Sequence, residues 1–182
     1  MGDPKRNRTK YQRSKVMWNK VRIDHEHEIK EKYGLKNLRE LWKAGTEVSR
    51  IKRNAREVLS NKAGSKVGSD MIARLVRYSI IEKGAKVDDL LSITPEAILN
   101  RRLQSVVLKA GLARTAKQSR QLIAHGFIAI NGRKVKSPGY LVAADEESRI
   151  GYYKPINLEV KPQEEEAAKA EAKVEAPKAE TK

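Results

Sequence analysis

The chain has 182 residues, with 39 Lys and Arg against 23 Asp and Glu, which gives a formal net charge of +16. This length suits one compact domain or two small ones, and the charge indicates a nucleic-acid or anionic-membrane partner. Cysteine is absent, which excludes disulfide scaffolds, thiolate zinc sites and cysteine nucleophiles and fits a reducing cytosol. No apolar run approaches the roughly 18 residues that a membrane helix needs, and no hydrophobic leader follows the amino terminus, so we expect a soluble cytoplasmic protein with no membrane partner.

Residues 1–33 are predicted to form an extended basic amino-terminal arm. Within it, residues 1–22 carry eight bases and one acid, and too few apolar side chains to fold alone. Arms of this kind follow a phosphate backbone and become ordered on contact. Trp18 would either stack on a base or hold the arm against the folded body, and the second role is favoured because large aromatic side chains are usually buried. The candidate contacts of the arm are Lys5, Arg6 and Arg8.

Residues 34–96 predict a mainly helical unit that residues 150–162 complete. Asn37 followed by Glu40 has the spacing of a helix cap with a supporting acid, and Thr46 is expected to cap a second helix. Three arginines recur on that second helix at three-residue spacing, close enough to follow successive phosphates, although a solvated face is the alternative explanation. These are Arg50, Arg53 and Arg56.

A third helix is expected after the glycine-punctuated link at residues 61–68. Ser69 is its predicted amino-terminal cap and Gly84 its predicted end. Asp88 and Asp89 then predict a short acidic turn, because adjacent carboxylates at such a place cap backbone N–H groups far more often than they catalyse.

The stretch from Ala97 to Ala144 is the most informative part of the chain, because its 48 residues include no Asp or Glu. For a single charged helix a solvated face is the more common explanation, but the lack of compensating acids over this length reverses those odds. A folded basic surface that binds a polyanion in a fixed register is therefore predicted. The stretch carries nine cationic side chains, which are Arg101, Arg102, Lys109, Arg114, Lys117, Arg120, Arg133, Lys134 and Lys136.

Two helices are predicted in this acid-free stretch. The first begins at the Thr94 cap and runs without interruption to Gly111, with an apolar back and a cationic front. The second begins with a capping box formed by Thr115 and Gln118 and ends at Gly126. Its outer face is expected to carry Lys117, Arg120 and Gln121.

A β-hairpin is predicted next, since Asn131 and Gly132 form the preferred dipeptide of a two-residue turn. Pairing across that turn sets Ile130 opposite Arg133, and a further strand is expected to begin at residues 140–142. The stretch therefore predicts a small helix-helix-hairpin unit.

The stretch between Arg101 and Val142 contains several short motifs, which are, in chain order, Arg102-Leu103, Gly111-Leu112-Ala113-Arg114, Arg120-Gln121-Leu122-Ile123, His125-Gly126, Asn131-Gly132 and Pro138. In this order they resemble the RNA-binding module named after the fourth small-subunit ribosomal protein. Residues 1–18 and the run YGLKNLRELWK also resemble the amino-terminal region of the archaeal and eukaryotic form of that protein. The resemblance covers the chain from about Met1 to Pro155.

The resemblance implies a mainly helical α+β fold, in which a helical unit carries an inserted module at residues 97–149 and a disordered Ala, Glu and Lys tail follows at residues 163–182. It implies a structural constituent of the small ribosomal subunit that binds small-subunit ribosomal RNA directly, nucleates assembly of the subunit body and contributes to translational accuracy beside neighbouring small-subunit proteins. The protein is not expected to form a homo-oligomer. With the arm residues and the three arginines of the second helix, the expected RNA contacts are Arg101, Arg102, Lys109, Arg114, Thr115, Lys117, Gln118, Arg120, Gln121, His125, Asn131, Arg133, Lys134 and Lys136.

Other proteins with this module offer two alternatives. A pseudouridine synthase needs a large sheet-rich catalytic domain with an aspartate base, and the residues outside the module are too few and too helical to form one. A stand-alone binder of transfer RNA or of stalled ribosomal particles is the other alternative. His125 either caps helix carbonyls or meets RNA, and the sequence favours neither. His25 and His27 lack the further ligands of a metal site, and phosphate loops and a nucleophile elbow are missing, so we expect no cofactor and no enzyme.

Overall fold

The structure, a computed structural model, describes residues 9–60 and 65–155. In this part of the chain, seven α-helices, one 3-10 turn and a three-stranded antiparallel sheet form the mainly helical α+β fold that the sequence predicts. The predicted contacts Lys5, Arg6 and Arg8 and the predicted tail at residues 163–182 lie outside the described residues. No helix among the described residues is both long enough and apolar enough to cross a membrane.

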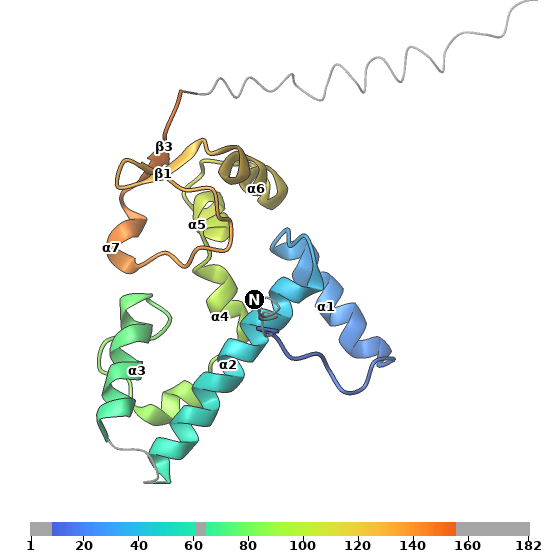
Figure 1. The fold of residues 1–182 in the computed structure, drawn as a ribbon, viewed down its shortest axis with the longest axis vertical. Coiled ribbons are helices and arrows are strands. Elements are labelled where there is room, and N and C mark those ends of the chain that lie inside the picture. Colours follow the sequence, from blue (N-terminus) through green and yellow to red (C-terminus); the bar gives the residue numbers. More distant parts are fainter. Residues whose placement is uncertain (1–8, 61–64, 156–182) are drawn as a thin grey trace, which may run out of the picture.

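The lower part of the molecule in Figure 1 is a helical unit built around one long helix. It comprises α1 (Lys20–Lys32), α2 (Leu38–Leu59), α3 (Ser65–Arg77), the 3-10 turn η1 (Val87–Leu91) and α4 (Pro95–Asn100). The extended arm predicted for residues 1–33 is therefore too long, because residues 20–32 form a helix whose Ile29 is buried in the core of this unit. Helix α2 is central, because α1, α3, η1 and α4 all contact it. The apolar side chains that meet at this centre include Leu41, Val48, Ala55, Leu75, Leu90 and Leu99.

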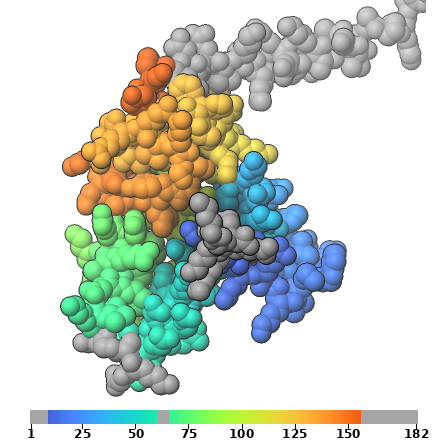
Figure 2. Space-filling view, in the orientation of Figure 1, coloured from blue at the N-terminus to red at the C-terminus, as the bar shows by residue number. Residues whose placement is uncertain are grey.

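The upper part of the molecule is the small unit of helices and sheet (Figure 1 and Figure 2), which is joined to the helical unit through α4. It contains α5 (Leu103–Lys109), α6 (Ala116–His125), β1 (Ile128–Ile130), β2 (Arg133–Lys134), α7 (Ala144–Glu147) and β3 (Ile150–Tyr152), with the strand order β2-β1-β3. A second apolar core fills it, separate from the first, and includes Leu103, Val106, Val107, Ile123, Ile128 and Val142.

The Thr115 cap, the Gly126 helix end and the Asn131-Gly132 turn are confirmed, but the predicted capping box is only half formed, because Gln118 Oε1 accepts the Arg114 N–H and not that of Thr115. The Thr115 side chain accepts a hydrogen bond from the Gln118 N–H at 3.1 Å and begins α6, and Gly126 ends that helix at a φ of 76°. Asn131 and Gly132 both have positive φ angles of 52° and 75°, as the predicted two-residue turn requires. Ile130 lies opposite Arg133, as predicted.

The single helix predicted from Thr94 to Gly111 is wrong, because the chain breaks at Arg101 and Arg102 into α4 and α5. Arg102 is extended, with φ −71° and ψ 144°. The break frees backbone groups for a distant segment, so that Leu103 N–H donates to the Tyr140 carbonyl at 2.7 Å and Val142 N–H to the Arg101 carbonyl at 3.0 Å. These non-local bonds replace helical ones, and residues 140–142 form only an isolated bridge there instead of the predicted strand.

The predicted boundary at Thr46 is also wrong, since α2 runs through it without interruption. The Thr46 hydroxyl donates to the Trp42 carbonyl at 2.7 Å, one turn back in the same helix, instead of capping a new one. The third helix begins at Ser65, four residues before the predicted cap at Ser69, and ends at Arg77, before Gly84. The acidic turn is confirmed, because the Asp89 carboxylate accepts the Lys86 N–H at 2.8 Å.

Residues 150–152 do not return to the helical unit as predicted. They form β3, which pairs antiparallel with β1 and sets Ile128 opposite Tyr152. The physical reason is that β1 has a free edge and a buried side that Ile150 extends. The remainder of the predicted return, residues 156–162, lies outside the described residues.

Candidate nucleic-acid interface

The start of α6 presents exposed polar and cationic side chains on a well-defined backbone. Gln118 Oε1 accepts the Arg114 N–H at 2.8 Å, while Thr115 holds the Gln118 N–H, so these two side chains shape the turn that enters the helix. Arg114, Lys117 and Gln121 are exposed beside this turn. The first turn of α6 contains no acid, so its positive helix end and these cations attract the same anionic ligand.

A groove beside α6 extends this basic surface onto the helical unit. Lys117 and Arg120 line it together with Lys30 and Lys36, and Glu31 is the one acid among the described residues that line it. The sequence does not mark Lys30 or Lys36 as candidates, because Lys30 stands between Glu28 and Glu31 and neither lysine belongs to a run of bases. Their place beside α6 depends on how the two units pack. We call Arg114, Lys117, Lys30 and Lys36 the α6 face.

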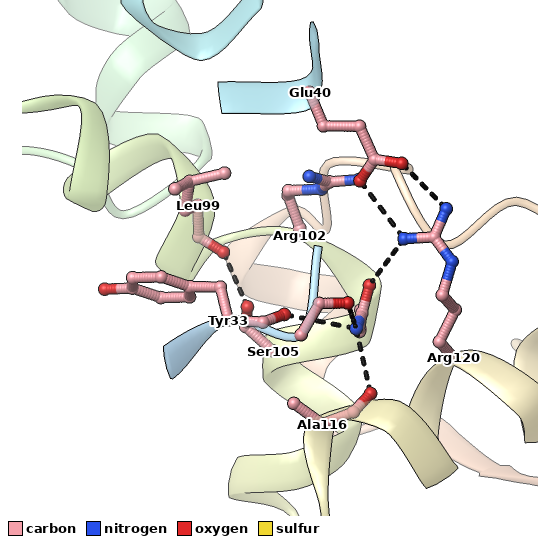
Figure 3. Close-up of polar contacts among 9 residues, drawn as sticks. Tyr33, Glu40, Leu99, Arg102, Ser105, Ala116 and Arg120 are labelled. Atoms are coloured by element: carbon pink, nitrogen blue, oxygen red, sulfur yellow. Dashed lines mark hydrogen bonds and ion pairs between the residues drawn. The ribbon is translucent and has the colours of Figure 1, made fainter. Parts of the chain in front are cut away.

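Three of the arginines predicted to bind RNA are instead engaged within the protein. Figure 3 shows the Glu40 carboxylate between two of them, accepting from Arg102 Nη2 at 2.8 Å and from Arg120 Nη2 at 2.7 Å. Arg102 is buried, and the Glu40 side chain is only 19% exposed. Arg101 donates to Glu147 at 2.8 Å and to the Val142 carbonyl at 3.3 Å. Their RNA contacts stay predictions, and their geometry gives them a role in joining parts of the fold.

The Glu40 carboxyl has a depressed pKa. Its burial alone would raise the pKa, but hydrogen bonds from Arg120 and Arg102, together with their charges, outweigh burial and hold it below the ordinary value of 4.5. Glu40 is therefore ionised at neutral pH and pairs with both guanidinium groups. The sequence predicts a helix cap at Asn37 supported by Glu40, but no side-chain cap bond forms at Asn37.

A buried amide reinforces the same junction. Gln104 Nε2 donates to the carbonyls of Tyr33, Gly34 and Ala116 at 3.1, 3.0 and 2.8 Å, which ties the α1–α2 loop to α5 and α6 (Figure 3). Gly34 has a φ of +59°, and a β-carbon there would lie 2.8 Å from the Ala116 β-carbon. The two units therefore meet in a close, directional contact that fixes how the α6 face is assembled.

The far edge of the sheet carries the remaining cations of the stretch. Arg133, Lys134 and Lys136 are exposed, as is Lys109 at the end of α5. The Lys134 ammonium lies 5.9 Å from the centre of the Tyr153 ring, and the Lys134 side chain crosses Gly126, where it would meet an added β-carbon. Asn131 is exposed in the turn, where its Oδ1 accepts from Arg149 at 3.5 Å.

His125 is exposed at the end of α6, and its ring centre lies 6.4 Å from that of Phe127. Neither of its two predicted roles is decided by this position.

The arginine row of α2 forms a second basic surface on the helical unit. Arg50, Arg53 and Arg56 are exposed and line a groove together with residues 9–12 of the arm. Arg53 makes only a long contact of 3.8 Å with Glu57, which is half exposed, so the row stays available to an anionic ligand. Among the described residues, no three His, Asp or Glu side chains gather closely enough to hold a metal ion.

The arm is attached to the helical unit through Tyr11, not through Trp18. Tyr11 packs on Trp42 with ring centres 5.8 Å apart, and Arg13 lies 6.0 Å over the same ring. Trp18 is 90% exposed, so the expectation that it holds the arm against the body is wrong. The smaller aromatic side chain takes that role because Trp42 offers it a partly buried partner on α2.

Comparison with known proteins shows similarity along most of the chain. Residues 101–148 match the S4 domain family. The small ribosomal subunit protein uS4 of Methanothermobacter thermautotrophicus is 46% identical over 84% of this chain and 91% of its own length. The uS4 protein of Thermoplasma volcanium is 46% identical over 89% of this chain and 84% of its own length, and that of Methanococcus vannielii is 45% identical over 94% and 99%. The similarity thus extends well beyond residues 101–148 into the helical unit.

Proposed function

The chain belongs to the uS4 family of archaeal small ribosomal subunit proteins, structural proteins that are not enzymes, and on this premise we propose that it is a primary binder of small-subunit ribosomal RNA. Primary binding means that it recognises the naked RNA with no other protein present. In this role it nucleates assembly of the body of the subunit in cytoplasmic ribosomes. The same family membership supports contacts with neighbouring small-subunit proteins and a contribution to translational accuracy.

The observation that carries this proposal is the α6 face. Cations from two separate units meet there: Lys117 of one unit and Lys30 and Lys36 of the other line the same groove, and the exposed Arg114 lies just before α6. Such a surface neutralises phosphates of strands that converge, which stabilises an RNA junction that the RNA alone populates poorly. Double-stranded RNA is recognised mostly through its shape and phosphates, so a rigid array of cations is sufficient for the task.

The Glu40 and Gln104 contacts support the same mechanism. They hold the helical unit and the S4 domain in one orientation before RNA arrives, so the cost of ordering the two units is met during folding and not during binding. Arg102 and Arg120 act here as positioning residues, while the exposed cations act as phosphate contacts.

The direct test is binding of the full chain to transcribed archaeal small-subunit ribosomal RNA, with no other protein present. A primary binder forms a specific one-to-one complex that survives an excess of large-subunit ribosomal RNA as competitor. Equal binding to both RNAs would contradict the proposal and leave only nonspecific attraction by a chain of net charge +16. Stoichiometric presence in isolated small subunits separates this function from that of a stress-dependent chaperone.

A further inference from the structure

An exposed apolar cluster at the start of α1 has no role in the proposed function so far. Trp18 is 90% exposed, Val21 80%, Met17 67% and Val16 64%. A single exposed apolar residue is ordinary, but a Trp with three apolar neighbours in the same short segment is typical of a contact surface.

The backbone beneath this cluster is held in place. Asn19 Oδ1 accepts the Arg22 N–H at 3.3 Å and caps α1, and the Arg22 guanidinium donates to the Met17 carbonyl at 2.9 Å. Upstream, the Gln12 N–H donates to Thr46 Oγ1 at 3.0 Å. Trp18 is therefore displayed from an anchored segment, so a ligand that contacts it meets a side chain whose backbone is already ordered.

The charge around the cluster favours a polyanionic partner. No Asp or Glu occurs between Pro4 and Ile23, and the described part of this segment carries five bases, Lys10, Arg13, Lys15, Lys20 and Arg22. An aromatic side chain among cations without acids is the combination that binds unpaired nucleotides, since the cations hold phosphates and the ring stacks on a base. A protein pocket for Trp18 would have to accommodate this positive charge as well.

We propose that Trp18 stacks on an unpaired nucleobase of the ribosomal RNA, with Lys15 and Lys20 contacting the adjoining phosphates. This inference rests on the proposed function and adds a second, single-stranded contact to it. In Figure 1 the start of α1 lies at the outer edge of the molecule, away from α6, so the stacked base belongs to a different RNA segment from the one on the α6 face.

Four full-length proteins test this proposal against transcribed archaeal small-subunit ribosomal RNA: the wild type and the variants Trp18→Ala, Trp18→Leu and Trp18→Tyr. Stacking predicts that Ala and Leu weaken binding roughly 5- to 100-fold, while Tyr, which retains a ring, stays within about threefold of the wild type. The Leu variant is the matched control for an apolar pocket, because it retains apolar volume and loses only the ring.

Salt dependence separates stacking from charge. Trp18→Ala is expected to leave the slope of log affinity against log salt unchanged, while Lys15→Ala reduces its magnitude by about 0.7 to 0.9. Circular dichroism checks that each variant is folded.

Two outcomes would overturn the stacking proposal. Equal affinity of Trp18→Ala and wild type for the naked RNA would do so, and if that variant were also lost from reconstituted subunits, the cluster would be a protein-docking site. Full affinity in the Leu variant would show that the ring is not used. Failure of the wild type itself to bind would instead contradict the proposed function.

Discussion

Arg120 Nη2 donates a hydrogen bond to Glu40 Oε1 at 2.7 Å, across 80 positions of sequence. The same carboxylate accepts from Arg102, so the first turn of α2 holds the start of α5 and the outer side of α6 at once. One acid in the helical unit therefore holds two arginines of the acid-free stretch, so part of the positive charge of that stretch stabilises the fold.

Glu40→Gln is expected to lower the free energy of unfolding by about 1 to 3 kcal/mol, because it leaves two partly buried guanidinium groups without an anionic partner. Urea unfolding followed by circular dichroism measures this change. Glu57→Gln is the matched control on the same helix, since Glu57 is half exposed and makes only a 3.8 Å contact with Arg53, and it should change stability by no more than about 0.5 kcal/mol. Equal losses of stability in the two variants would show that the ion pairs of Glu40 stabilise the fold no more than an exposed ion pair does.

The stabilisation from Glu40 should depend on pH in a defined direction. The folded-state pKa of Glu40 is depressed, so its contribution is present above the unfolded value near 4.5 and is lost as pH falls through the folded pKa. The difference in unfolding free energy between wild type and Glu40→Gln should be constant near neutrality and shrink below about pH 4.5. Other carboxyls cancel in this difference, and a difference that stayed constant down to pH 3 would refute the assignment.

Gly34→Ala should destabilise the protein more than a positive φ alone explains. At Gly34 a β-carbon would meet both the Ala116 side chain and its backbone, at 2.8 and 3.0 Å, and would crowd the Gln104 amide. Gly111→Ala is the matched control, because Gly111 also has a positive φ of 73° but open space around its β-position. We expect about 1 kcal/mol of lost stability for Gly111→Ala and about 1 to 3 kcal/mol more for Gly34→Ala, measured by thermal and urea unfolding. Equal losses would mean that the two units are not in close contact there.

Lys36, which the sequence analysis missed, should contribute to RNA binding as much as a cation of the S4 domain does. Lys36→Ala is expected to weaken binding uniformly and to reduce the magnitude of the salt slope by about 0.7 to 0.9, the effect of one lost phosphate contact. Lys83→Ala is the control, since Lys83 is exposed but does not line the α6 groove. Filter binding of the full chain to the RNA at four salt concentrations measures both slopes, and an unchanged slope for Lys36→Ala would exclude Lys36 from the interface.

Sequence reasoning succeeded where the signal is local. Thr115, Gly126 and the Asn131-Gly132 turn act through bonds or dihedral angles within a few residues, so their effect can be read directly from the chain. It failed where distant segments compete for the backbone. The helix break at Arg102 depends on hydrogen bonds to residues about forty positions later, which helical periodicity cannot show.

The candidate site follows the same division. The acid-free stretch identified the S4 domain as the basic unit, but which of its cations are free depends on partners elsewhere in the chain. Lys117 and Arg120 are predicted on the same outer face of the helix, yet only Arg120 reaches Glu40. Lys36 reaches the α6 face because Gln104 holds the loop that carries it against α5 and α6, a contact that the local sequence does not show.

The central claim is that the α6 face binds small-subunit ribosomal RNA, and the double variant Arg114→Glu with Lys117→Glu tests it most directly. Both side chains are exposed and neither belongs to the Glu40 junction, so unfolding free energy should stay within about 1 kcal/mol of wild type. We predict at least a tenfold loss of affinity for the naked RNA at moderate salt. Unaltered affinity in the folded double variant would contradict the account and show that this face is ordinary solvated surface.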